Sequence, residues 1–165
     1  MKQLIYITLI GFNLFNINGK AQIAVTYIPF QSIFGISSNV EKLMWVDYKI
    51  ETNNFASSLD MEISQKINFK RKEIVNYYVG PGFSFNPAYS FVDLPFTNGY
   101  FIEFGTRIKP IAKFKNIQLM FELSPYINNK LNNGYLRTRL GFSYNFIPKS
   151  KVNNELNKEN TVNAR

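Results

Sequence analysis

The sequence predicts an all-β protein, specifically an eight-stranded antiparallel up-and-down transmembrane β-barrel. Three observations lead to this fold class. Apolar and polar residues alternate with a period of two along most of the chain, which places successive side chains on opposite faces of a strand. The apolar faces are rich in aromatic residues, which make up 16% of the chain. The other faces mix acids, bases and glycines, as expected for the interior of a membrane barrel.

Length and composition narrow the choice of function. A chain of 165 residues is long enough for one domain that closes a small barrel. The absence of Cys excludes disulfides and thiolate metal sites, and the absence of His removes the commonest general base and metal ligand. We therefore expect no catalytic residue, no metal, no cofactor and no enzymatic activity. The net charge is +8, but the basic residues are scattered among acids, so nucleic acid is not an expected partner.

Residues 1–21 have the layout of a cleaved secretory signal peptide. Lys2 provides a positive end, residues 4–15 are largely apolar, and Gly19 and Ala21 supply small residues before the expected cleavage site. The alternative is a first core strand or an amphipathic helix. The order of the three regions favours export, and an exported protein without cysteines suits a bacterial envelope.

The first half of the mature chain predicts four strands. A short one begins at Ile23 and ends near Pro29, and the next three cover residues 30–39, 44–51 and 59–69. The charged residues of these strands recur on the face opposite the apolar one: Asp47, Lys49, Glu51, Asp60, Glu62 and Lys66. Most strands are expected to have about nine to thirteen residues, which suits a tilted span of a membrane.

The second half repeats this alternation more clearly. Four further strands are expected over residues 75–85, 100–109, 117–126 and 134–146. The connections 87–98 and 128–133 are expected to be loops on the outer side, together with 53–56. The turns expected on the periplasmic side are 41–42, 70–73 and 110–115. Residues 147–165 lose the alternation and are predicted to form a disordered polar tail.

Five charged residues on the polar faces are candidates for an ionic network inside the barrel: Glu103, Arg107, Glu122, Arg137 and Arg139. Eight strands leave an interior that side chains just fill, so we expect a closed lumen and not a pore. Opposite charges at these positions then compensate groups that are costly to bury. The alternative is a narrow polar path for ions or a small solute. Gly80 and Gly82 lack the residues that follow in a phosphate-binding loop, and are expected to relieve crowding or to bend a strand inside a small barrel.

The last strand carries a recognisable pattern. Arg139 is followed by Gly141, and aromatic residues stand three and five positions after the glycine, at Tyr144 and Phe146. This pattern resembles the C-terminal assembly signal of bacterial outer-membrane barrels. Residues 22–146 as a whole are similar to the small outer-membrane β-barrel proteins of Bacteroidetes, the OmpA/OmpX-like group.

The resemblance implies a location in the bacterial outer membrane and a non-enzymatic structural or surface-interaction role. It also implies contact with outer-membrane lipid, insertion by the barrel assembly machinery, and an extracellular ligand held by loops 87–98 and 128–133. The competing interpretation is a soluble periplasmic β-barrel or sandwich that binds an apolar ligand.

Overall fold

The computed structural model of the chain describes residues 22–52, 59–91, 94–111 and 113–146. The expected signal peptide (1–21) and the expected tail (147–165) therefore lie outside the described residues.

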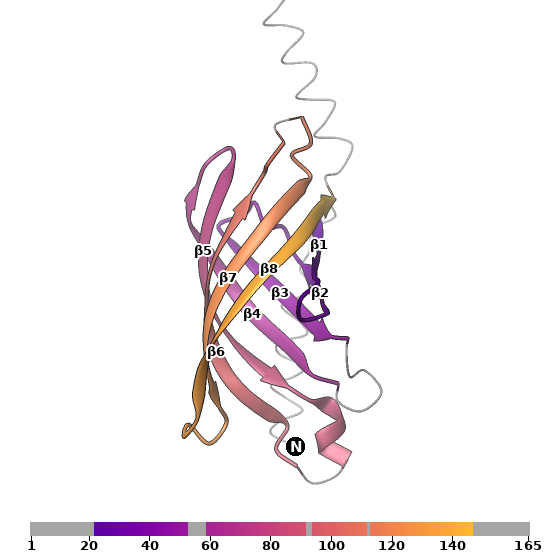
Figure 1. Ribbon diagram of the computed structural model, residues 1–165, viewed down its shortest axis with the longest axis vertical. Helices are drawn as coiled ribbons and strands as arrows, with labels where there is room; N and C mark the ends of the chain where they lie inside the picture. The colour runs from indigo at the N-terminus through magenta and orange to yellow at the C-terminus, as the bar shows by residue number, and fades with distance from the viewer. Residues whose placement is uncertain (1–21, 53–58, 92–93, 112, 147–165) are drawn as a thin grey trace, which may run out of the picture. The chain divides into compact units, whose positions relative to one another are not determined.

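The described residues form an eight-stranded, closed, antiparallel up-and-down β-barrel (Figure 1). Its strands are β1 (Ile23–Ile28), β2 (Ile33–Ser37), β3 (Met44–Glu51), β4 (Met61–Arg71), β5 (Val75–Phe85), β6 (Thr97–Ile108), β7 (Ile117–Asn128) and β8 (Gly134–Phe146). Each strand pairs with the next, and β1 pairs with β8 to close the ring. This confirms the predicted strand number and order.

The alternation of residue types determines which side of each strand faces the interior. On β8, Leu140, Phe142 and Tyr144 are exposed on the outer face, whereas Arg139 and Ser143 are buried inside. The same parity holds on β3, where Trp45 is buried and Met44 is exposed. Because the interior receives the polar positions, most of its buried side chains are polar or charged.

Glycine is required in the barrel wall where a large aromatic ring of the interior lies directly against the backbone. A Cβ on Gly105 would overlap the ring of Tyr78, and a Cβ on Gly82 would overlap the ring of Phe101. Gly80 approaches the backbone of β4 so closely that a Cβ would collide with the carbonyl of Gln65. The glycines therefore relieve crowding, as the sequence predicts.

The second strand is shorter than predicted. β2 contains 5 residues in place of the expected 30–39, whereas β1, with 6 residues, and β3, with 8, agree with the expected short first strand and the expected strand over 44–51. Residues 29–32 form a turn and not the start of the second strand. The physical cause lies at Ser32, whose φ of 51° is left-handed, and at Pro29, which has no N–H for the ladder.

One predicted loop is also shorter than expected. β6 begins at Thr97, three residues before the predicted start, because Thr97 and Gly99 pair with β5. A 3-10 helix, η1 (Pro87–Phe91), occupies part of the same connection. Among the described residues, no helix is both long and apolar enough to cross a membrane.

The two ends of the barrel differ. We call the end that carries the β1–β2, β3–β4, β5–β6 and β7–β8 connections the loop end. The other end, with the β2–β3, β4–β5 and β6–β7 connections, is the turn end.

Candidate functional site

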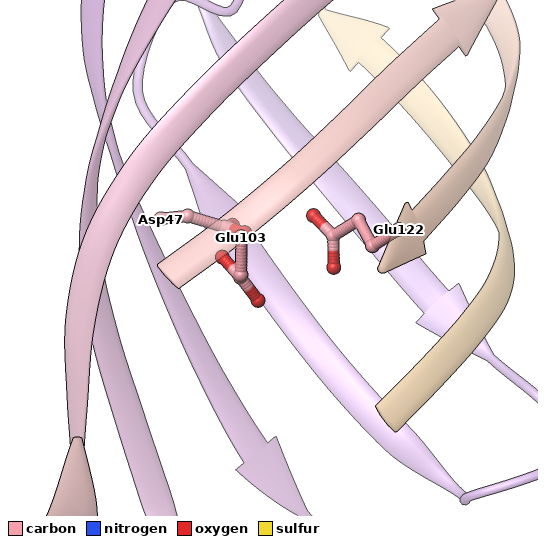
Figure 2. A group of neighbouring side chains, drawn as sticks. All are labelled: Asp47, Glu103 and Glu122. Atoms are coloured by element: carbon pink, nitrogen blue, oxygen red, sulfur yellow. The ribbon is translucent and has the colours of Figure 1, made fainter. Parts of the chain in front are cut away.

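Three carboxylates from different strands meet at the centre of the barrel. Asp47 on β3, Glu103 on β6 and Glu122 on β7 are fully buried and point toward one another (Figure 2). One oxygen from each lies within 4.8 Å of the others. Three like charges at this separation repel strongly in a poorly solvated interior, so the group needs cations beside it.

Two lysine side chains supply those cations. Lys49 Nζ lies 2.6 Å from Glu103 Oε1 and 2.6 Å from Glu122 Oε2. Lys66 Nζ lies 2.7 Å from Asp47 Oδ2, 2.9 Å from Glu103 Oε2 and 2.5 Å from Glu122 Oε1. Each ammonium thus bridges carboxylates of several strands. We call these five residues the central cluster.

The surroundings of the central cluster complete its hydrogen bonding. The Tyr78 hydroxyl donates to Glu122 Oε1 over 2.8 Å, and Ser64 Oγ donates to Glu103 Oε2 over 3.0 Å. The ammonium of Lys66 also lies 5.0 Å from the ring centroid of Trp45, within range of a cation–π interaction. Buried charges remain tolerable when they are paired and hydrogen-bonded in this way.

The same three carboxylates have the spacing of a metal site, since their oxygens are close enough to share one cation. Both sides of the group are taken by the ammonium groups of Lys49 and Lys66, however. A divalent ion would have to displace two hydrogen-bonded lysines and leave them buried. The central cluster is therefore a network of ion pairs that links β3, β4, β6 and β7 across the interior.

A second cluster lies nearer the loop end. Glu62 on β4 accepts hydrogen bonds from Arg139 through both carboxylate oxygens, each over 2.8 Å, and from Arg137 Nη1 over 2.6 Å. Arg139 Nη1 also lies 3.1 Å from Glu103 Oε1, which links this cluster to the central one. The Arg137 guanidinium is 4.7 Å from the ring centroid of Phe101 and 4.4 Å from that of Tyr126.

Arg107 is buried without a salt bridge to a described carboxylate. Its Nη1 donates to Ser143 Oγ over 2.7 Å, and its Nη2 donates to Ser37 Oγ over 3.3 Å. Ser37 in turn donates to Asp47 Oδ1 over 2.7 Å. The serine therefore connects the guanidinium to the negative charge of the central cluster. The guanidinium also lies 4.8 Å from the ring centroid of Trp45.

The β2–β3 connection closes the turn end. Val40 is fully buried and belongs to a cluster with Ala24, Trp45 and Tyr78. The next residue, Glu41, accepts hydrogen bonds from three side chains that reach it from other strands or connections: Asn76 (3.1 Å), Lys109 (3.1 Å) and Gln118 (2.9 Å). Burial raises the pKa of Glu41, but the charge of Lys109 and these hydrogen bonds together lower the pKa by more. The pKa of Glu41 is therefore below its ordinary 4.5.

At the loop end a cavity of about 100 Å³ opens above the second cluster. Its lining is mainly polar and includes Glu51, Asp60, Glu62, Tyr135 and Arg137. Asp60 accepts hydrogen bonds from Asn98 over 2.7 Å and from Asn86 over 3.2 Å. We call this space the mouth cavity.

The five predicted network residues occupy different positions. Glu103, Arg107, Glu122 and Arg139 are buried inside, and Arg137 is half-buried nearer the loop end. Arg139 and Glu103 form an ion pair, Arg137 pairs with Glu62 instead, and Arg107 contacts serines. Of the assembly-signal residues, Arg139 and Gly141 face inward, whereas Tyr144 and Phe146 are exposed on the outer face.

Sequence reasoning left four residues out of the predicted network: Asp47, Lys49, Glu62 and Lys66. The available signal was the alternation of opposite charges on the inward faces of β3 and β4, as in Asp47 and Lys49. This alternation identifies the charged side chains that face inward, but it does not show which of them form ion pairs.

Comparisons with known proteins do not assign a family. No family model and no curated protein matches the chain. A solved structure described as "De novo design of transmembrane beta-barrels" is 17% identical over 76% of this chain and 92% of its own, with a TM-score of 0.45.

Proposed function

We propose that this protein is an integral β-barrel of the bacterial outer membrane with a structural or surface-interaction role. The observation that carries the proposal is an inverted polarity: charged side chains fill the interior and large apolar side chains are exposed outside. The exposed apolar residues of the strands include Phe34, Ile36, Met44, Ile67, Phe69, Tyr100, Ile102, Phe104, Phe121, Leu140, Phe142, Tyr144 and Phe146.

The energetics favour lipid as the medium around this surface. Moving one large apolar side chain from water into an apolar medium lowers the free energy of the protein by roughly 1.5–3 kcal/mol. A belt of such residues on every strand is far more than a monomer in water normally exposes. In a bilayer the same residues become the favourable surface, and the ladder of the closed ring pairs the backbone groups of the strands except on the β1 side of β8 between residues 134 and 141.

The filled interior supports a role without transport or catalysis. The central cluster and the Glu62 cluster place paired side chains across the lumen where a pore would need open space. Acid–base catalysis would need a group free to exchange a proton with a substrate, and these carboxylates are engaged by lysine and arginine. The proposed partners are outer-membrane lipid, the assembly machinery during insertion, and an extracellular ligand at the loop end.

The competing proposal is a soluble periplasmic barrel that binds an apolar ligand. Such a protein needs an apolar interior, as in barrels that hold a small ligand. Among the described residues, the interior instead carries the eight buried or half-buried charged side chains of the two clusters, and their ion-pair partners are one another. The interior formed by the described residues therefore offers no apolar site for such a ligand.

Cell fractionation tests the membrane proposal. The full-length chain is expressed in a Gram-negative host, and the mature protein is followed by gel migration with and without boiling. We expect it in the outer-membrane fraction, extractable only with detergent, and with a faster-migrating unboiled form. Recovery in the soluble periplasmic extract would overturn the proposal.

A planar-bilayer recording then tests the filled interior. The purified, inserted barrel is expected to give no steady conductance, because ion pairs cross the lumen at two levels. Sustained, sizeable conductance from the unmodified protein would favour the alternative of a polar path for ions.

A further inference from the structure

The turn end of the barrel carries most of the exposed positive charge of the described residues. The basic side chains of its three connections and the adjoining strand ends are Lys42, Lys70, Arg71, Lys72, Lys109, Lys113 and Lys115. All of them are exposed except Lys109, which is half-buried. The acidic side chains of the same segments are Glu41 and Glu73. Seven bases and two acids give the described part of the turn end a formal charge of +5.

The loop end differs from the turn end in charge. Among the described residues, its connections carry one acid and one base, Asp60 and Lys130. The exposed basic side chains are therefore concentrated at one end of the barrel. A charge distribution of this kind attracts an anionic partner to that end.

Much of the positive charge at the turn end is not neutralised by the protein. Lys109 Nζ lies 3.1 Å from Glu41 Oε2, and Lys115 Nζ lies 3.1 Å from Glu73 Oε1, so both acids are already engaged. Four other ammonium groups form no side-chain hydrogen bond or ion pair with the described residues: Lys42, Lys70, Lys72 and Lys113. An external anion can therefore pair with them.

Hydrogen bonds join the three connections into one surface. Arg71 Nη1 donates to the carbonyl of Glu41 over 3.3 Å, which links the β4–β5 connection to the β2–β3 connection. The backbone N–H of Lys109 donates to the carbonyl of Ile74 over 2.8 Å, which links the end of β6 to the β4–β5 connection. We call this surface the basic rim, and it consists of residues 38–43, 70–74, 109–111 and 113–116.

Large apolar side chains are interleaved with the basic ones on the basic rim. Phe114 stands between Lys113 and Lys115, and Leu43 follows Lys42. The exposed fractions lie between 46% and 58% for Leu43, Ile74, Ile111 and Phe114. Apolar groups beside long basic side chains suit the boundary between lipid headgroups and acyl chains, because the apolar groups enter the boundary and the charged ends reach the headgroups.

We propose that the basic rim binds anionic phospholipid headgroups in the bilayer leaflet at the turn end. This inference rests on the proposed membrane location, and it adds the class of lipid and the end of the barrel that selects it. The unpaired ammonium groups of the connections attract the phosphate groups, since each Lys or Arg near an anionic membrane surface adds to the attraction. The apolar side chains hold the connections at the depth of the headgroups.

A water-soluble acidic polypeptide fits the basic rim less well. It would neutralise the ammonium groups but would leave the apolar side chains, such as Ile74 and Phe114, beside water. An anionic phospholipid supplies a phosphate for the charges and an acyl chain for the apolar side chains. The basic rim also continues the exposed apolar belt of the strands, which the membrane proposal places in lipid.

The test uses the full-length mature barrel inserted in phosphatidylcholine bilayers, with insertion verified by the faster migration of the unboiled form. Electron paramagnetic resonance measures how much spin-labelled lipid is immobilised on the barrel. The same label is carried by phosphatidylglycerol, which is anionic, or by phosphatidylcholine. The ratio of their association constants is the lipid preference.

Three variants locate the preference on the barrel. A glutamine triple variant, Lys42→Gln with Lys72→Gln and Lys113→Gln, removes one unpaired charge from each connection of the basic rim. The same three substitutions to arginine keep the charge and form the matched control. Lys130→Gln removes a charge at the loop end.

We expect the unmodified barrel to prefer phosphatidylglycerol about three-fold at low salt, and the glutamine triple variant to prefer it only about 1.5-fold. The arginine triple variant and Lys130→Gln are expected to keep the preference of the unmodified barrel. Salt at roughly 0.5 M is expected to remove most of the preference, because it screens exposed charges.

Equal association of both lipids with an inserted, unmodified barrel would overturn the inference and leave the membrane proposal intact. A preference that survives in the glutamine triple variant, or that Lys130→Gln reduces equally, would overturn the assignment to the basic rim. A preference that does not change with salt would overturn the charge pairing, even if the triple variant failed to fold.

Polyglutamate distinguishes an acidic polypeptide from a lipid as the partner. Its binding to the unmodified barrel but not to the glutamine triple variant, without any lipid preference, would overturn the inference in favour of an acidic polypeptide. A barrel that does not insert at all would instead count against the proposed function.

Discussion

Glu62 on β4 and Arg139 on β8 form a two-pronged ion pair across the interior, with both N···O distances at 2.8 Å. The pair spans the barrel at the level where β8 has lost its backbone partner β1. Side-chain contacts therefore tie this part of β8 to the opposite wall, in addition to its backbone ladder with β7.

We expect Glu62→Gln to destabilise the barrel by about 3 kcal/mol, because it leaves Arg139 and Arg137 with too little negative charge. The measurement is the free energy of unfolding from urea titration in detergent. The control is Glu73→Gln, since the Glu73–Lys115 pair is exposed at 77% and 51% and contributes little. Equal stability of the two variants would show that the internal pair contributes no more than a surface one.

Gly105 provides a second test, because it leaves room for the Tyr78 ring inside the barrel. A Cβ at Gly105 would overlap this ring, whereas a Cβ at Gly35 would have its nearest neighbours at 3.5 Å. Gly105→Ala is expected to reduce stability by roughly 1–3 kcal/mol through overpacking. Gly35→Ala is expected to fold normally, and the comparison uses the temperature at which the fast-migrating form is lost. Similar temperatures for both variants would contradict the close packing of Tyr78 on Gly105.

Glu41 predicts a pH dependence of stability. Burial raises the pKa of its carboxyl, but Lys109 and the hydrogen bonds lower the pKa by a larger amount, so the folded-state pKa is below 4.5. A lowered pKa stabilises the folded state above pH 4.5, and this stabilisation is lost as the pH falls through the folded-state pKa.

We expect the difference in unfolding free energy between the unmodified protein and Glu41→Gln to shrink on acidification. Urea titrations across the acidic range measure it. Glu73→Gln serves as the control with an exposed carboxylate. A difference that stays constant down to low pH would show that Glu41 is not held ionised by Lys109.

Phe146 tests the predicted assembly signal. Phe146 and Phe142 lie on the outer face of β8 with similar exposure, 52% and 56%, so their truncations cost similar apolar contact. Phe146→Ala is therefore expected to reduce the amount of assembled barrel in the outer membrane more than Phe142→Ala does. The readout is the quantity of the heat-modifiable form in the membrane fraction. Equal amounts would remove the support for recognition of Phe146 itself.

The sequence by itself determined which side chains face inward and which face outward. Period-two alternation leaves no other assignment for strands such as β3, where Trp45, Asp47 and Lys49 share a face opposite Met44 and Val46. Strand order also followed from the alternation and the turn residues, because each antiparallel neighbour is joined by a short connection. The number eight followed from seven clear strands, a weak first strand and the even strand number of bacterial barrels.

Only the tertiary structure decided which inward charges meet. Lys49 contacts Glu103 and Glu122, 54 and 73 residues away, and these meetings depend on the stagger of strands around the closed ring. The late start of β2, at Ile33, could not be predicted either, because alternation does not reveal the left-handed φ at Ser32. β8 lacks β1 as a neighbour from residue 134 to 141 because a long strand closes against a short one, and a pattern within a single strand carries no information about the length of its neighbour.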